Sequence, residues 1–147
     1  MLERAIEIAA QAHRGQRAQA GGRGILHPLR VMMACSPGDA RIVGVLHDVV
    51  EDGVERTFDR LHEAGPDAQV LRALDAVPKR DGEGYSDLTD RTGQDPIACE
   101  VKVADLRDDV DLTRIPDPTA HDHERLRKRE ASLQRLTALR PLPWSAD

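Results

Sequence analysis

Hydrophobic side chains recur with a helical period along nearly the whole chain. Over residues 2–13, one stripe at i, i+3 and i+4 spacing carries small and aliphatic side chains and one histidine: Leu2, Ala5, Ile6, Ala9 and His13. This spacing is typical of an amphipathic helix packed on a core. By the same criterion we predict helices at 2–13, 28–35, 40–52, 57–64, 67–77, 96–112 and 121–139. No segment alternates as a half-buried strand does, so the pattern predicts an all-α, compact, single-domain helical fold.

Proline, glycine and capping residues mark the ends of these helices. Pro28 suits the first position of a helix, and Asp39 suits the N-cap of the next one. Residues 78–95 are polar and rich in glycine. We therefore predict a loop there, with no more than one helical turn after Tyr85.

The last predicted helix closes the domain. Its four leucines are expected to face the core: Leu126, Leu133, Leu136 and Leu139. We expect the domain to cover residues 1–140 and residues 141–147 to form a tail.

Composition narrows the classes of function. A chain of 147 residues, 39% of them hydrophobic, can bury one core. Its formal net charge is −5 and it has only three aromatic residues. A nucleic-acid polymer is therefore excluded as a partner, because such surfaces need basic stripes and aromatic stacking platforms. A small phosphorylated ligand stays compatible, provided that its charge is neutralised locally.

Nothing in the sequence suggests a membrane or an export route. The first helix carries charges that a signal peptide would lack, and the uncharged runs are too short to cross a bilayer. Cys35 and Cys99 lack metal or redox spacing and are predicted to be buried thiols in a reducing compartment. We expect a cytoplasmic protein with no membrane partner. The oligomeric state stays open.

The segment 40–52 carries the first candidate chemistry. His47, Asp48, Glu51 and Asp52 are set into an otherwise apolar run. Their offsets of i, i+1, i+4 and i+5 bring them onto adjacent ridges of one helix face. Taken alone, each of them would be interpreted as a solvent-exposed residue at the polar edge of an amphipathic helix. For the whole set, a shared cation is the more economical explanation, since burying four unpaired titratable groups would be costly.

Two further residues complete a candidate site. His27 stands where a loop becomes a helix, and Asp105 interrupts an apolar stretch. Asp105 alone could equally be a solvated surface acid. Together with His47 and Asp48, these residues offer two imidazoles and two carboxylates. That ligand set suits Mn²⁺, Fe²⁺ or Zn²⁺ and leaves positions for water and substrate.

The order of these motifs resembles a known family. The first predicted helix carries alanines and ends in H-x-G-Q at His13. Three further motifs follow in the sequence: H-P at His27, L-H-D-V-V-E-D from Leu46 and K-V-A-D-L from Lys102. This combination resembles the HD-domain metallophosphohydrolases. It is most similar to the hydrolase domain of RelA/SpoT-type enzymes of the stringent response and to small stand-alone alarmone hydrolases. The resemblance covers roughly residues 5–135.

The resemblance implies roles for individual residues. It makes the metal ligands His27, His47, Asp48 and Asp105, with Mn²⁺ as the expected ion. It also makes Glu51 and Asp52 the acidic pair that positions or activates the attacking water. The implied reaction removes pyrophosphate from the ribose 3′ position of (p)ppGpp, which would be the small nucleotide substrate.

The chain departs from the family pattern at two places. The resemblance implies an Arg-Lys pair for substrate binding where this chain has Ala18 and Gln19. Arg17 or Arg23 could replace it. The family also carries an asparagine where this chain has Asp109. A carboxylate there would repel a polyanionic nucleotide unless it is protonated or paired, with Arg107 as one candidate partner.

A few further residues are weaker candidates for substrate binding. Lys79 and Arg80 could meet phosphate and Tyr85 could pack on a base, although charged residues in a loop are usually only solvated. Lys102 could contact a phosphate or form a surface salt bridge. His13 is expected to be structural and hydrogen-bonded.

Two other functions remain open at this stage. One is a different nucleotide phosphatase of the same family, which the departures at Ala18, Gln19 and Asp109 favour. The other is a nucleotide- or metal-binding regulatory module with weak catalysis. The pair Glu51 and Asp52 argues against the module, because a non-catalytic protein has little need for both beside a metal.

Overall fold

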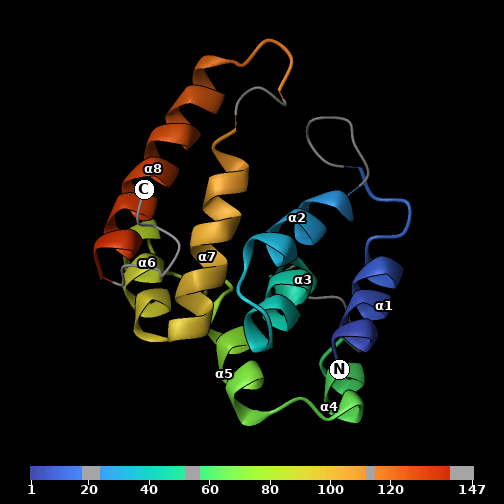
Figure 1. Ribbon diagram of the computed structural model, residues 1–147. Coiled ribbons are helices and arrows are strands. Elements are labelled where there is room, and N and C mark those ends of the chain that lie inside the picture. The colour runs from blue at the N-terminus through green and yellow to red at the C-terminus, as the bar shows by residue number, and fades with distance from the viewer. Residues whose placement is uncertain (18–23, 52–56, 112–114, 140–147) are drawn as a thin grey trace.

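The structure is a computed structural model that describes residues 1–17, 24–51, 57–111 and 115–139. Within these ranges the chain is all-helical, without a β-strand, which confirms the predicted fold class (Figure 1). The helices are α1 (Leu2–Ala12), α2 (Leu26–Ala34), α3 (Asp39–Glu51), α4 (Thr57–Ala64), α5 (Ala68–Ala76), α6 (Tyr85–Gln94), α7 (Pro96–Asp109) and α8 (Ala120–Leu139).

Helix α3 lies at the centre of the fold and contacts α1, α2, α5 and α7. Most of its residues are buried, including His47. Gly44 lets α2 come close, because a Cβ at this position would lie 3.2 Å from the Met32 Cα and 3.3 Å from the Cys35 Sγ. A larger residue would push α2 outward and, with it, His27 near the start of that helix.

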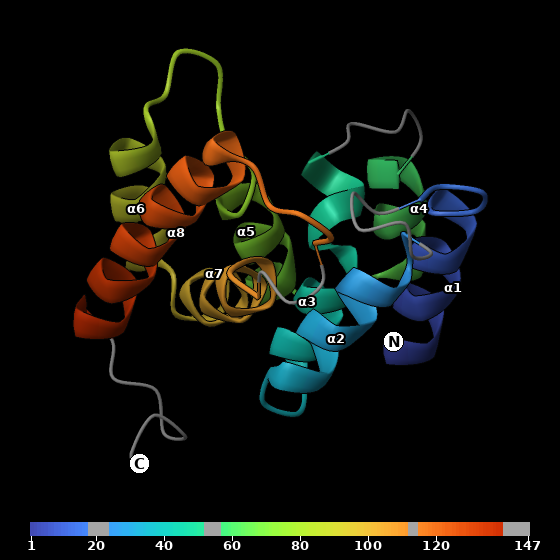
Figure 2. The same ribbon diagram turned by 90° about the horizontal axis from the view of Figure 1, so that it is seen from above.

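Helix α7 separates two groups of helices, with α6 and α8 on one side and α1, α2 and α3 on the other (Figure 2). It is buried on both sides. Ala98, Val101 and Ala104 pack into the larger core with α1 to α5. Residues on its other side, such as Val103 and Leu106, pack with Leu136 of α8 in a smaller core. A helix that packs on two cores holds the polar side chains between them in fixed positions.

Helix α6 is longer than predicted: we expected a loop over residues 78–95 with no more than one helical turn after Tyr85, and the prediction of a loop was wrong over most of this helix. The helix covers ten residues, Tyr85–Gln94. Its buried face is formed by one leucine, two threonines and a glycine, so it lacks the hydrophobic pattern of the other helices: Leu88, Thr89, Thr92 and Gly93. Hydrogen bonds hold it instead, since the hydroxyls of Thr89 and Ser132 of α8 lie 2.7 Å apart.

The inward direction predicted for the leucines of α8 is correct only in part. Leu136 is fully buried and Leu133 packs against the smaller core. Leu139, at the end of the helix, is 55% exposed. The core that α8 covers is small, so the periodic pattern of the sequence extends beyond the surface that it can bury.

Both cysteines are buried thiols, as predicted. In the part of the chain that the structure describes, every helix is too short or too polar to cross a lipid bilayer.

Candidate metal centre

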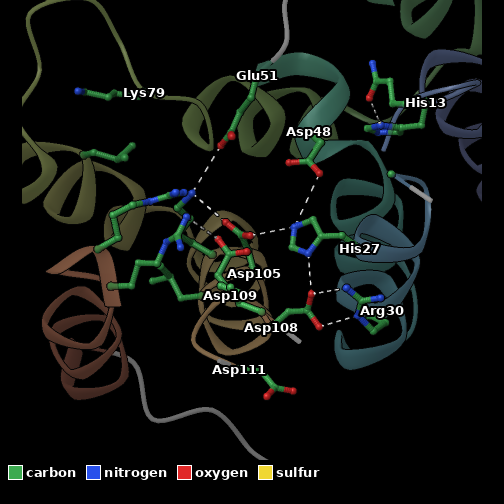
Figure 3. Close-up of a pocket in the computed structure, with 18 of the residues that line it drawn as sticks. His13, His27, Arg30, Asp48, Glu51, Lys79, Asp105, Asp108, Asp109 and Asp111 are labelled. Atoms are coloured by element: carbon green, nitrogen blue, oxygen red, sulfur yellow. Dashed lines mark hydrogen bonds and ion pairs between the residues drawn. The ribbon is translucent and has the colours of Figure 1, made fainter. Parts of the chain in front are cut away.

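A pocket of about 580 Å³ opens where α2, α3 and α7 meet, and α6 and α8 face it from the other side. His27, Asp48, Glu51 and Asp105 line its inner end (Figure 3). We call His27, His47, Asp48 and Asp105 the candidate metal centre. We call the side chains on the opposite side the outer wall: Tyr85, Leu88, Arg125 and Arg129.

His47 is completely buried in α3, and one of its ring nitrogens forms a hydrogen bond with the backbone. Its Nδ1 lies 2.7 Å from the Gly44 carbonyl oxygen, which can only accept, so Nδ1 donates. Its Nε2 has no hydrogen-bond partner among the described residues. This nitrogen lies 3.1 Å from an Asp48 oxygen and 3.6 Å from an Asp105 oxygen. A buried nitrogen that makes no hydrogen bond and faces two carboxylates has the arrangement of a metal ligand. Burial by itself would lower the pKa of His47, but without a metal Asp105 and Asp48 raise it well above its ordinary value.

His27 reaches the same carboxylates from α2. Its Nδ1 lies 2.6 Å from an Asp108 oxygen, and Arg30 holds Asp108 with two further hydrogen bonds of 2.8 and 2.9 Å. Its Nε2 lies 3.2 Å from Asp105 and 3.7 Å from Asp48. The two imidazoles therefore use their Nδ1 atoms in the same way and present both Nε2 atoms to one place, as zinc- and manganese-binding histidines do.

Lys102 supports this centre from within α7. Its ammonium group lies 2.9 Å from Asp105 and 3.5 Å from Glu51, and only 8% of the residue is exposed. The surface salt bridge considered for Lys102 is therefore a buried one. One oxygen of Asp105 is bound by Lys102, and its other oxygen faces the two histidines.

Without a metal, these groups shift one another's protonation. Burial by itself would lower the pKa of His27, but Asp105 and Asp108 bind its ring and raise that pKa to about 9. Burial would raise the pKa of Asp105, but the charge of Lys102 and the two neighbouring histidine rings hold it well below its ordinary value. For Glu51 burial dominates and raises the pKa, against the opposing charge of Lys102. The centre is therefore a set of carboxylates compensated by cations, as a site for a divalent ion would be.

Asp109 joins the centre to the outer wall. One of its oxygens lies within 4.8 Å of ligand atoms of both His27 and Asp105. On its other side it forms a 3.4 Å ion pair with Arg129 of α8. The candidate partner Arg107 is exposed. Burial and the charge of Asp105 raise the pKa of Asp109, while Arg129 lowers it.

The remaining predicted residues divide into three groups. Arg17, Lys79, Tyr85 and Lys102 line the pocket. Arg80 pairs with Asp75 and is not among the lining residues. The third group, which lies outside the described residues, is Ala18, Gln19, Arg23 and Asp52.

His13 takes the structural part expected of it. It is buried, and its Nδ1 lies 2.9 Å from the side-chain oxygen of Gln16.

Sequence reasoning missed several residues that line the pocket, among them Arg30, Asp108, Arg125 and Arg129. Asp108 meets His27 across 81 positions of sequence, so only the packing of α2 on α7 brings them together. Arg125 and Arg129 are one helical turn apart, which is a usable signal. That signal was hidden because α8 carries several other basic residues.

Comparison with known proteins finds distant relatives. No protein-family model matches the chain. It is 27% identical over 121 residues to a guanosine-3′,5′-bis(diphosphate) 3′-pyrophosphohydrolase of Aquifex aeolicus, covering 74% of this chain and 17% of the relative. It is 35% identical over 80 residues to a protein of the same name from Borreliella burgdorferi, covering 52% and 12%. A GTP pyrophosphokinase of Streptomyces coelicolor is 32% identical over 118 residues, covering 71% and 14%.

These matches support a relation to the RelA/SpoT proteins. The chain spans between 12 and 17% of the length of the three relatives, so it corresponds to a small part of each of them.

Proposed function

We propose that the chain is a metal-dependent phosphohydrolase acting on a nucleotide, and most specifically that it removes the 3′-pyrophosphate from (p)ppGpp. The observation that carries this proposal is the arrangement of the two histidines. Each donates from Nδ1 to a fixed acceptor, Gly44 or Asp108, and each turns Nε2 toward Asp48 and Asp105. Two relatives named (p)ppGpp pyrophosphohydrolases support the choice of substrate.

The ligands proposed for the metal are His27, His47, Asp48 and Asp105. Ligand atoms of His27, His47 and Asp48 lie within 4.8 Å of one another, and those of His27, Asp105 and Asp109 form a second such group. Asp105 also comes within 3.6 Å of His47 Nε2. This donor set fits a divalent ion such as Mn²⁺. When bound, such an ion would lower the pKa of a water and polarise a phosphoryl oxygen.

Glu51 is the proton acceptor in this proposal. It follows Asp48 by three residues, so both side chains project from the same end of α3 toward the pocket (Figure 3). Lys102 engages one of its oxygens, Oε1, which leaves Oε2 to take a proton from the attacking water. Burial raises the pKa of Glu51, which makes it a better base than an ordinary carboxylate. The part assigned to Asp52 stays a prediction.

The test is a panel assay with purified protein, Mn²⁺ and a set of nucleotides that includes ppGpp, with products separated by chromatography. Release of pyrophosphate from ppGpp is the expected result. Glu51→Gln should lower kcat about 100-fold or more, since general-base catalysis is worth about 10²–10⁴. The exposed Glu63→Gln of α4 should leave kcat unchanged.

A second candidate is hydrolysis of another nucleotide by the same centre. Asp109 favours it, because this carboxylate lies in the pocket where a polyanionic nucleotide would have to bind. Orthophosphate released from another member of the panel would support it. No product from any nucleotide, with metal bound, would instead support a regulatory module and contradict catalysis.

A further inference from the structure

We propose that Arg129 is a substrate-binding residue of this pocket, and that Asp109 is its positioning residue. Arg129 would bind the phosphate group of the substrate that lies farther from the metal. This inference rests on the proposed function, because it assigns a place to the part of a phosphorylated substrate that the candidate metal centre does not bind.

The position of Arg129 is the first argument. Asp109 forms an ion pair with Arg129 at 3.4 Å and also comes within 4.8 Å of ligand atoms of His27 and Asp105. The guanidinium group is therefore separated from the candidate metal centre by little more than one carboxylate group. A substrate carrying two linked phosphate groups could bind to both places at once.

The donors of Arg129 are the second argument. Arg91 shows what a structural arginine looks like here, since it binds both oxygens of Glu83 and the carbonyls of Ala76 and Pro78. Arg129 makes a single contact, by Nη2 at 3.4 Å, among the described residues, and its side chain is 24% exposed. A guanidinium has five N–H donors in a planar fork that matches phosphate. Arg129, which lines the pocket, therefore retains donors that Asp109 does not use.

The charge of the pocket is the third argument. Its described lining contains six carboxylates and six lysine or arginine side chains. A divalent ion would make this balance positive and suited to an anion. Several of the basic groups are already committed to acids near the metal, as Lys102 is to Asp105 and Arg30 is to Asp108. Arg129, in the outer wall, is placed to meet the remainder of the substrate.

The competing explanation is that the pair of Asp109 and Arg129 only ties α7 to α8, and the experiment separates the two.

The experiment measures the binding of inorganic pyrophosphate to the Mn²⁺-loaded full chain by calorimetry. Arg129→Gln should weaken pyrophosphate binding about 10-fold or more, the usual effect of losing one charged hydrogen bond. Arg129→Lys should restore part of this loss, because it keeps the charge but not the fork. The matched control is Arg127→Gln on the same helix, which is exposed and does not line the pocket. It should change binding less than 2-fold.

Two further readouts guard against a structural effect. Thermal unfolding and Mn²⁺ affinity should be the same in Arg129→Gln as in the unchanged protein. Unchanged pyrophosphate affinity in Arg129→Gln would overturn the inference, as would an equal loss in Arg127→Gln or an unchanged protein that binds no pyrophosphate.

The outcome does not depend on finding the right nucleotide. If the panel assay yields no hydrolysis, the proposed function fails, while the pyrophosphate titration still decides the role of Arg129. If ppGpp is hydrolysed, Arg129→Gln should raise KM about 10-fold with kcat little changed. A fall in kcat at unchanged KM would contradict a role in binding.

Discussion

The two sides of the pocket are built differently. In the candidate metal centre three of the four side chains are held by a specific partner: Gly44 fixes His47, Asp108 fixes His27, and Lys102 fixes Asp105. The outer wall comes from α6 and α8, which pack on a core of only four fully buried residues. There Arg129 forms one ion pair among the residues that the structure describes, and Tyr85 is partly buried. The difference indicates that the chemistry is preorganised on one side, while the other side determines which substrate fits.

The largest effect is expected from a substitution that breaks the buried charge network of the candidate metal centre. Lys102→Met should lower the free energy of unfolding of the metal-free protein by about 3–5 kcal/mol, because it leaves Asp105 and Glu51 without their cation. Lys79→Met, an exposed lysine of the same pocket, should change it by about 0.5 kcal/mol or less. Urea denaturation measures both. Equal effects would contradict the contrast between the two sides.

A truncation in the smaller core, on which α8 packs, tests whether the two sides of the pocket are structurally independent. Leu136→Ala truncates the fully buried leucine that α8 contributes to the smaller core and should cost about 2–3 kcal/mol of unfolding free energy. Mn²⁺ affinity should stay within about 3-fold of the unchanged protein, while pyrophosphate binding weakens with the displacement of α8. A parallel loss of both would show that the two sides fold as one unit.

A smaller effect is expected from the support of His27. Asp108→Asn keeps an acceptor for Nδ1 but loses the charge that Arg30 clamps. Mn²⁺ affinity should fall about 10-fold, as is typical for partners that orient a metal-binding histidine. Unchanged Mn²⁺ affinity would contradict this role of Asp108.

The smallest expected effect is the pH dependence of Mn²⁺ binding. In the metal-free fold the pKa of His27 is raised from 6.5 to about 9, so its ring carries a proton at pH 7 that a metal must displace. Mn²⁺ binding should therefore release protons and strengthen as the pH rises from 6.5 to 8. The same shift stabilises the metal-free fold fully below pH 6.5, and this stabilisation is lost as the pH rises through 9. Calorimetry in buffers of different ionisation enthalpy counts the protons, and the absence of release would contradict the protonated His27.

The sequence predicted the site residues best where polar side chains interrupt a segment with a strong helical hydrophobic pattern. The run around His47 and Asp48 predicted both a helix and a candidate site, and α3 holds these residues as expected. Asp105 stood out for the same reason within α7. The structure brings these residues together with His27, although their use as metal ligands remains a proposal.

The rest depended on packing that no local pattern encodes. Helix α6 is held by the hydroxyls of Thr89 and Thr92 and by the anchoring of Arg91 on residues before it, so its sequence looked like a loop. The roles of Asp108 and Arg129 come from contacts between helices far apart in sequence. Such pairings follow from the tertiary fold and cannot be read from the spacing within one segment.

The most direct test of the account is the metal content of the protein itself. The purified chain, His47→Ala and Asp48→Ala are dialysed against Mn²⁺, and bound metal is counted by elemental analysis, with Asp87→Ala on the exposed face of α6 as the control. We predict stoichiometric metal in the unchanged chain and in the control, and its loss in both ligand variants. Stoichiometric metal retained in both His47→Ala and Asp48→Ala would contradict the assigned centre.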